Sequence, residues 1–320
     1  MTTKLIFDSD GGVDDAQALL LLVANGRSPD LITTVFGNVG RDQATANLLA
    51  VAAYCDLDVP VHRGADRPLV QPIIDATHVH GNDGLGGAPR PASQAAPASD
   101  DAVGVLVRTF REAVARGEKV DILMIGPLTN LALALRLDPG ITAGIGTLTI
   151  MGGTVYGRGN TTPAAEFNIY ADPEAAHIVL TAGVETIVVP WEACLAHYMA
   201  GDRVDALFES VPPSPVRDFS RALVDHYRGI RRRNGHPDRM LYVDPLAAAV
   251  VVDPAIVRKS VSASTSVALG PGLTRGMTLV DPSGRLGTPK ITFVEEVDLA
   301  KVDALYARSV AYSPTSKPSN

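Results

Sequence analysis

The stretch KLIFDSDGGVDD, residues 4–15, joins a short apolar run to four carboxylates, those of residues 8, 10, 14 and 15. Lys4–Phe7 predicts a buried strand, and Asp14–Asn25 predicts a helix that stops near Gly26. The two glycines at positions 11 and 12 permit a tight turn between them. The chain therefore opens with a strand–turn–helix unit whose acidic side chains follow directly after the strand.

The same alternation continues along the chain. Further strands are expected at residues 31–36, 120–125, 146–151 and 186–190, and helices at 42–54, 102–116, 128–137 and 173–182. This order predicts an α/β fold with an open, mostly parallel, Rossmann-like sheet and helices on both faces. Residues 259–293 contain strand-like runs that would add a few antiparallel strands. We expect one domain over residues 1–312 and a frayed tail over 313–320.

Two segments interrupt the alternation, residues 63–97 and 212–240. Both are predicted to be irregular. Long irregular segments in a compact domain are often lids or binding loops, but exposed connections explain them equally well. Both interpretations stay open at the level of sequence.

Composition excludes several classes of protein. The 320 residues are 46% hydrophobic, which is enough for a large core, and the net charge is −7 without a Lys/Arg-rich patch, so nucleic acid is not an expected partner. Neither of the two cysteines stands in a CxxC pair, which argues against structural zinc. No stretch reads as a signal peptide or a membrane span. We expect a cytoplasmic protein that does not act at a membrane.

The acidic cluster needs compensation. Two like charges about 4 Å apart repel by roughly 4 kcal/mol at an effective dielectric constant near 20. A helix N-terminus offsets only about 0.3–1 kcal/mol per charge, so ordinary capping explains one carboxylate and not four. A bound cation would remove the conflict. Since the candidate ligands are all oxygens, Ca²⁺ or Mg²⁺ is favoured over zinc.

The segment LIFDSDGG resembles the first motif of haloacid-dehalogenase-like phosphatases, in which Asp8 would be the nucleophile. That alternative lacks a distal GDxxxD-like acidic pair. DSDGGVDDA also resembles the DxDPGxDDA motif of the nucleoside hydrolase family (inosine-uridine preferring type). Further matches follow in order, namely FGN at 36–38, GPLTNLA at 126–132, MGG at 151–153, AEFN at 165–168, and DPLA at 244–247.

The resemblance to nucleoside hydrolases implies a calcium-dependent enzyme that hydrolyses the N-glycosidic bond of ribonucleosides through an oxocarbenium-like transition state. It implies Ca²⁺ ligands and a catalytic residue, Asp10, which would take the proton of the attacking water. The implied ligands are Asp10, Asp15, the backbone carbonyl of Ile125, and Asp244. The implied ribose-binding residues are Asp14, Asn38, Asn160, Glu166, Asn168 and Asp244. Simple helix or loop capping remains an alternative role for Asp244 and for the asparagines.

The chain departs from the family pattern at the leaving-group side. Many members have a histidine before the distal aspartate, where this chain has Val243, which cannot donate a proton. Candidates for the base pocket are aromatic and histidine side chains, each of which has an ordinary structural alternative: Trp191, Tyr227, Tyr242, His80 and His236. The pattern's proline is replaced by Gly11, and Trp191-Glu192 replaces the usual Leu-Asp.

Three outcomes beyond the main prediction stay open: the phosphatase, a ribose- or nucleoside-binding homologue without turnover, and a hydrolase with a different leaving group. The resemblance also implies a homo-oligomer, a dimer or tetramer, that works in nucleoside salvage. The preferred base is not predicted.

Overall fold

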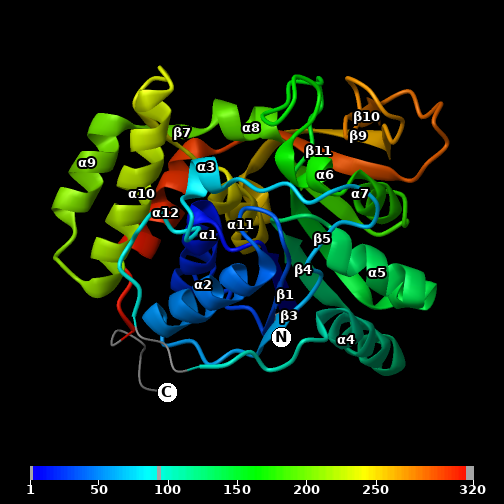
Figure 1. Ribbon diagram of the computed structural model, residues 1–320, viewed down its shortest axis with the longest axis horizontal. Helices are drawn as coiled ribbons and strands as arrows, with labels where there is room; N and C mark the ends of the chain where they lie inside the picture. Colours follow the sequence, from blue (N-terminus) through cyan, green and yellow to red (C-terminus); the bar gives the residue numbers. More distant parts are fainter. Residues whose placement is uncertain (1–2, 92–94, 315–320) are drawn as a thin grey trace.

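The computed structural model describes residues 3–91 and 95–314, which form a nine-stranded sheet covered by helices (Figure 1). The strands of this sheet are β1 (Lys4–Ser9), β2 (Leu31–Thr34), β3 (Val61–Arg63), β4 (Val120–Met124), β5 (Ile145–Met151), β6 (Thr186–Val189), β9 (Val257–Val267), β10 (Thr278–Asp281) and β11 (Lys290–Val297). A separate antiparallel pair joins β7 (Tyr198–Ala200) to β8 (Arg239–Leu241).

The strand order is β3-β2-β1-β4-β5-β6-β11-β9-β10. Pairing is parallel from β3 to β11 and antiparallel from β11 through β9 to β10. The order of the chain reverses between β1 and β4, and ligands of open α/β sheets bind beyond the carboxyl ends of the strands at such a point. The predicted fold is thus confirmed, including the antiparallel strands near the C-terminus.

Helices pack on both faces because strand side chains alternate. Leu5 and Phe7 of β1 lie in one buried cluster, and Ile6 lies in the other. The first cluster is covered by α1 (Val13–Ala24), α2 (Arg41–Tyr54), α8 (Trp191–Ala196), α9 (Gly201–Ser210), α10 (Pro215–Arg233), α11 (Asp244–Val252) and α12 (Leu299–Val310). The second is covered by α4 (Ala102–Arg116), α5 (Thr129–Leu137), α6 (Phe167–Ala171) and α7 (Pro173–Leu180), with short 3₁₀ turns at Pro139–Gly144 and Pro254–Ile256.

The expectation of an irregular segment at 212–240 is wrong. Most of it is α10, a helix of 19 residues that begins with Ser214 as N-cap and Pro215 in the first turn. Val216, Phe219 and Leu223 recur at helical spacing and are buried against the core. The many charged residues of the other face conceal this pattern in the sequence.

The segment 63–97 is largely irregular in its described part, as expected, and contains only the short helix α3 (Thr77–His80). Figure 1 shows α3 next to α10, so the two segments singled out in the sequence lie side by side. Within the described residues, no helix has both the length and the apolar character needed to cross a membrane. The predicted frayed tail, 313–320, lies outside the described residues from 315 onward.

Candidate active site

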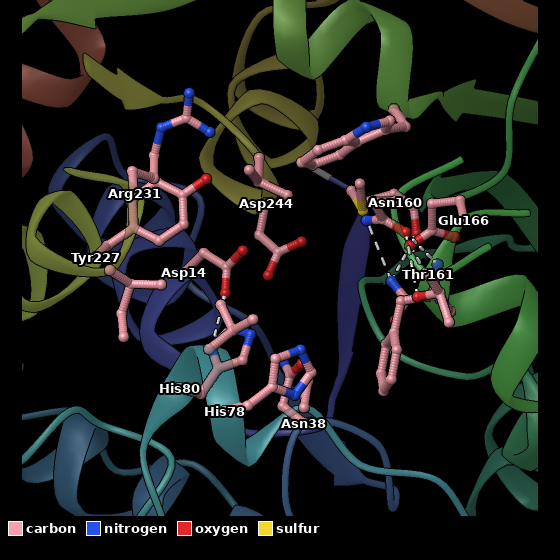
Figure 2. A pocket seen from close by; sticks show the side chains of 18 of the residues that line it. Asp14, Asn38, His78, His80, Asn160, Thr161, Glu166, Tyr227, Arg231 and Asp244 are labelled. Atoms are coloured by element: carbon pink, nitrogen blue, oxygen red, sulfur yellow. Dashed lines mark hydrogen bonds and ion pairs between the residues drawn. The ribbon is translucent and has the colours of Figure 1, made fainter. Parts of the chain in front are cut away.

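A pocket of about 250 Å³ lies at the carboxyl ends of β1, β4 and β5, where the strand order reverses (Figure 2). Loops after these strands form its floor, and α3, α6 and α10 contribute walls. Its lining includes Asp14, Asn38, Ile125, Asn160, Glu166, Asn168 and Asp244, which are site residues predicted from the sequence.

Three carboxylates converge at this pocket. Asp14, Asp15 and Asp244 each present an oxygen within 4.8 Å of the other two. The first two lie in the first turn of α1, and Asp244 is the first residue of α11. Two helix N-termini therefore meet here, and their dipoles favour negative charge.

Asp244 is not an ordinary N-cap. Val243 occupies the cap position of α11, and no side chain caps that helix. By contrast, Asp172 in the similar Asp-Pro sequence caps α7 by accepting a hydrogen bond from the Ala175 N–H at 3.1 Å. The capping alternative thus applies to Asp172, while the Asp244 carboxylate lies with the other two acids.

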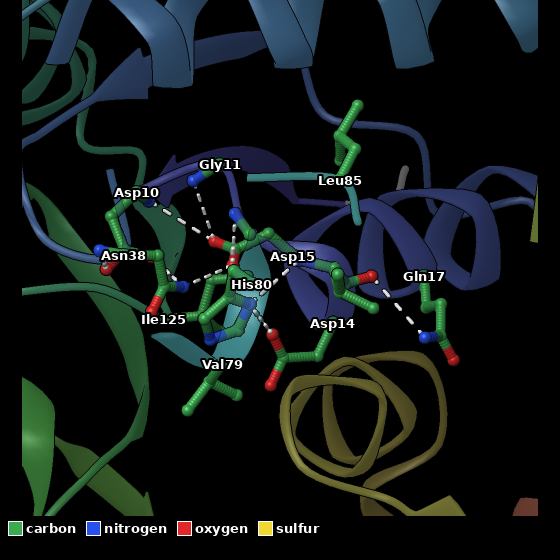
Figure 3. A network of polar contacts seen from close by, with 12 residues as sticks. Asp10, Gly11, Asp14, Asp15, Gln17, Asn38, Val79, His80, Leu85 and Ile125 are labelled. Carbon is green, nitrogen blue, oxygen red and sulfur yellow. Dashed lines mark hydrogen bonds and ion pairs between the residues drawn. The ribbon is translucent and has the colours of Figure 1, made fainter. Parts of the chain in front are cut away.

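The Asp15 carboxylate is held by its own turn (Figure 3). The backbone N–H groups of residues 10–12 donate to it at 2.8–3.2 Å, and the Ser9 hydroxyl donates at 2.6 Å. The Asn38 Nδ2 donates to it at 3.0 Å. The sequence of the turn thus fixes the position of this carboxylate.

Asp10 lies beside this group but outside it. Its carboxylate accepts hydrogen bonds from the Asn38 backbone N–H at 2.7 Å and from Asn38 Nδ2 at 2.9 Å. The Asn38 amide therefore bridges Asp10 and Asp15. Gly37 is required for this approach, since a Cβ at that position would lie 2.0 Å from Asp10 Oδ2. The geometry groups Asp14 with Asp15 and Asp244, where the resemblance had placed Asp10.

Burial and mutual repulsion disfavour the charged forms of these acids. Burial, and then the charge of Asp15, raise the pKa of Asp14 to about 7 and that of Asp10 well above its ordinary value. Burial and the neighbouring Asp14 and Asp15 likewise raise the pKa of Asp244. The Asp14 Oδ1 is buried without a hydrogen-bond partner among the described residues. A hard divalent cation fits this all-oxygen donor set.

The Ile125 carbonyl, also predicted as a ligand, is held at the end of β4. Asn168 Nδ2 donates to it at 3.0 Å and to the Met151 carbonyl at 3.1 Å. Asn168 therefore links the ends of β4 and β5 across the pocket floor. Its Oδ1 is the atom of the amide that these contacts leave for a ligand.

Asn160 and Glu166 line the opposite side and also cap their own loop. Asn160 Oδ1 accepts a hydrogen bond from the Phe167 N–H at 2.8 Å. Glu166 accepts from the backbone N–H groups of Gly153, Asn168 and Ile169 at 2.9–3.2 Å. Burial raises the pKa of Glu166 to about 7. Loop capping is thus real for both residues, and it places them at the pocket.

Among the base-pocket candidates, Trp191, Tyr227, His80 and His236 line the pocket, and Tyr242 does not. Tyr242 is fully buried elsewhere, stacks edge-on against Tyr306 and donates to Asp303 at 2.7 Å. The sequence signal for Tyr242, an aromatic residue two positions before Asp244, carried no information about the direction of its side chain.

His80 is a neutral imidazole in this environment. Its Nδ1 accepts a hydrogen bond from the Val13 N–H at 3.1 Å, and burial lowers its pKa to about 4. The 3.6 Å between this Nδ1 and Asp14 Oδ1 is therefore not an ion pair near neutral pH. Only its Nε2–H could donate to a ligand.

Sequence reasoning missed several residues of the lining. They include His78, Thr161, Ile230, Arg231 and Asn234. His78 was visible as part of an HxH pattern, and the three on or just after α10 required recognition of that helix. Ile230, Arg231 and Asn234 follow Tyr227 at helical spacing, which is the signal that could have found them.

Comparison with known proteins decides the family. Residues 5–304 match the family model of the inosine-uridine preferring nucleoside hydrolases. The chain belongs to this family. The non-specific ribonucleoside hydrolase RihC of Salmonella enteritidis is 36% identical over 294 residues, which is 90% of this chain and 92% of the relative.

Solved structures of nucleoside hydrolases have the same fold as this chain. A plant nucleoside hydrolase superimposes with a TM-score of 0.87 at 30% identity and covers 97% of this chain and 99% of its own. The purine-preferring ribonucleoside hydrolase of Gardnerella vaginalis has the same TM-score at 25% identity, with 97% and 98% covered. This nucleoside hydrolase is thus an enzyme of the predicted family. The phosphatase alternative is not favoured, and Asp8, its required nucleophile, is fully buried outside the pocket lining.

Proposed function

We propose that this nucleoside hydrolase releases ribose and a free base from ribonucleosides in a Ca²⁺-dependent reaction. The observation that carries the proposal is the convergence of Asp14, Asp15 and Asp244 within 4.8 Å in a pocket beyond the carboxyl ends of the strands. The names of the relatives, ribonucleoside hydrolases of broad or purine preference, support a ribonucleoside as substrate.

Asp10, Asp15, Asp244 and the Ile125 carbonyl would hold the cation. The convergence of carboxylates supports Asp15 and Asp244 in this set, and Asp14 lies close enough to stabilise the same charge. A donor set made of oxygen atoms alone favours Ca²⁺. When bound, the cation supplies positive charge that offsets the repulsion among the acids and lowers the pKa of a nearby water.

The sugar would lie between the acids and the capped loop opposite. Asp14, Asn38 and Asp244 would bind its 2′- and 3′-hydroxyls, and Asn160, Glu166 and Asn168 would bind it near the 5′-hydroxyl. Each of these side chains lines the pocket. The hydrogen bonds of Asn160, Glu166 and Asn168 to backbone groups hold these three side chains in place before the substrate arrives, which reduces the entropy lost on binding.

In the reaction, Asp10 would accept a proton from water as the water oxygen bonds to C1′. The C1′–N bond breaks, and both of its electrons go to the base. The sugar ring carries positive charge in this oxocarbenium-like transition state. The buried carboxylates around it stabilise that charge. Asn38, which donates to both Asp10 oxygens, orients the general base.

The test is release of ribose from a panel of ribonucleosides, measured with and without a chelator and after Ca²⁺ is restored. We expect turnover that the chelator abolishes and Ca²⁺ recovers. Asp10→Asn should lower kcat by about 10²–10⁴-fold while nucleoside binding persists. Asp42→Asn is the matched control, because the Asp42 side chain is 72% exposed and pairs with surface arginines.

Nucleoside binding without release of ribose by the wild type would favour the binding-homologue alternative. Turnover that survives complete chelation would contradict the role of the cation. Turnover with Mg²⁺ and none with Ca²⁺ would correct its identity.

We also propose that the enzyme works in the cytoplasm in nucleoside salvage, as a homodimer or homotetramer. The family membership supports this assembly by analogy only. Light scattering on the purified chain measures its mass in solution, and a monomer at micromolar concentration would contradict the proposal.

A further inference from the structure

With Val243 before the distal aspartate, the departing base has no proton donor at this position. Val243 lines the pocket at the start of α11, 8% exposed, and its side chain has no proton to donate. Breaking the C1′–N bond places negative charge on the departing base. Some other group must stabilise that charge, or the base leaves slowly.

Arg231 lies on the side of the pocket where the base would sit. Figure 2 shows Arg231 and Tyr227 together on one side, Asn160 and Glu166 on the other, and the Asp14 and Asp244 carboxylates between them. If the capped loop binds the 5′ end of the sugar, the base extends toward the other side.

The Arg231 guanidinium is poised for a ligand. Its Nε is buried and has no hydrogen-bond partner among the described residues. Its Cζ lies 5.9 Å from the centroid of the Tyr227 ring, which supports the guanidinium through a cation–π contact.

The neighbouring arginines on α10, Arg228 and Arg232, form ion pairs. Arg228 pairs with Asp205 and Asp238, each at 2.7 Å, and Arg232 pairs with Asp238 at 3.4 Å. These two arginines are held by ion pairs away from the pocket lining. Arg231, at the pocket, is the one whose N–H donor is left for another molecule.

Other candidates are less suited. His80 is neutral, and its Nδ1 already accepts from the Val13 N–H. Burial raises the pKa of Tyr227, which makes its phenol a weaker acid. His78 and His236 are exposed at the rim of the pocket.

We propose that Arg231 is a catalytic residue that stabilises the departing base, in place of the proton donor that Val243 lacks. This inference rests on the proposed function. A guanidinium stays protonated, so it acts as a hydrogen-bond donor and not as a general acid. As the C1′–N bond breaks and its electron pair moves to the base, an Arg231 N–H donates to an acceptor atom of that base.

The step balances in atoms and charge. The water hydroxyl bonds to C1′, its other proton goes to Asp10, and the base departs as an anion paired with the guanidinium. A proton from solvent then neutralises the base, and Asp10 returns its proton to solvent. The net reaction consumes one water and yields ribose and free base.

The test compares two leaving groups. Uridine carries a base that departs poorly, whereas 4-nitrophenyl β-D-ribofuranoside carries a phenolate that needs little help. We expect Arg231→Met to lower kcat on uridine by about 10²-fold, the loss typical of one removed transition-state donor. On the nitrophenyl riboside, kcat should change little, because the sugar side is intact.

Two further variants complete the experiment. Arg231→Lys keeps a charged donor and should recover part of the loss on uridine. Arg233→Met, two residues on at the exposed end of α10, should leave both substrates unaffected. Circular dichroism and Tm establish that each variant is folded.

Equal losses on the two substrates, or no loss on either, would overturn the role of Arg231 while the proposed function stands. A wild type that releases no ribose from any ribonucleoside would remove the proposed function and this inference with it.

Discussion

At the residue scale, the turn after β1 depends on Gly11. Its φ of +70° lies in the left-handed region, and a Cβ there would lie 2.5 Å from the Ala44 Cα. The family pattern has proline at this position, and proline cannot adopt this φ. The turn of this chain is therefore not a proline-type turn, although it places Asp15 against the backbone N–H groups of residues 10–12.

Gly11→Ala should lower the free energy of unfolding by roughly 2 kcal/mol or more, from left-handed strain together with overpacking against α2. Gly117→Ala is the control. Gly117 has a φ of +65°, but nothing lies within 4 Å of its Cβ position, so it should cost only about 1 kcal/mol. Urea denaturation measures both variants, and equal losses would contradict the role of the contact with Ala44.

Asp8 is a buried acid outside the pocket lining. Its Oδ2 accepts hydrogen bonds from Thr33 Oγ1 at 2.5 Å and Asn130 Nδ2 at 2.7 Å, and its Oδ1 has no partner among the described residues. Burial raises its pKa from 3.8 to about 7. The folded state therefore holds this proton more tightly than the unfolded state does.

It follows that the stabilising effect of Asp8 is complete below about pH 4 and is lost as pH rises through 7. Over this window the wild type should lose up to about 1.4 kcal/mol per pH unit relative to Asp8→Asn, whose amide does not titrate. Urea denaturation of both proteins at several pH values, with chelator present throughout, measures the difference. Parallel pH profiles would show that Asp8 keeps an ordinary pKa.

At the element scale, α10 brings Tyr227 and Arg231 to the pocket, so the anchoring of this helix fixes that side of the pocket. The Arg228 side chain is only 3% exposed and joins α10 to Asp205 of α9 and to Asp238 just before β8. Its NH2 also donates to the Gly201 carbonyl at 3.2 Å. One side chain thus ties three segments of the chain together.

Arg228→Met should lower the free energy of unfolding by about 1–2 kcal/mol, since several charge-assisted hydrogen bonds are lost while both aspartates can regain water. The control is Arg108→Met, which breaks an exposed pair with Asp101 and should cost about 0–1 kcal/mol. Thermal and urea denaturation provide the comparison. A loss at Arg228 no larger than at Arg108 would show that α10 is held by its apolar face alone.

At the scale of the whole molecule, the pocket exists because distant segments meet at one edge of the sheet. Acids from the first and eleventh helices, a carbonyl after β4 and an amide from α6 share it. The outermost of these groups, on α1 and α11, are separated by more than 200 residues in the chain. In the proposed binding mode a substrate contacts all of them at once, so removing one of its hydroxyls would leave several buried groups without partners.

We therefore expect 2′-deoxyribonucleosides to react much more slowly than ribonucleosides. A site built to bind a hydroxyl lowers kcat/KM for the analogue that lacks it by about 10⁴-fold. The measurement is kcat/KM for inosine and deoxyinosine. Asp42→Asn should keep the wild-type ratio, and equal values for the two substrates would contradict sugar binding through Asp14, Asn38 and Asp244.

The sequence by itself determined the class of fold, the family, and many of the residues that line the pocket. Apolar strand patterns alternate with helical patterns along the chain, and this alternation predicts a parallel sheet. Each pattern is local, so it can be recognised without knowledge of the tertiary structure. Asp15 could be placed as well, because the turn of residues 10–12 supplies most of its hydrogen bonds. The order of the motifs from Asp8 to Ala247 indicated the family, because each short motif can be recognised from local sequence.

Only the tertiary structure decided how distant residues share the site. It grouped Asp14 with Asp15 and Asp244, and it placed Asp10 against Asn38. It also turned Tyr242 into the core. The helix α10, hidden in sequence by its charged face, became ordered through burial of its other face, and with it Arg231 reached the pocket. Such contacts depend on packing between segments far apart in the chain, and no local pattern encodes the direction in which a side chain then points.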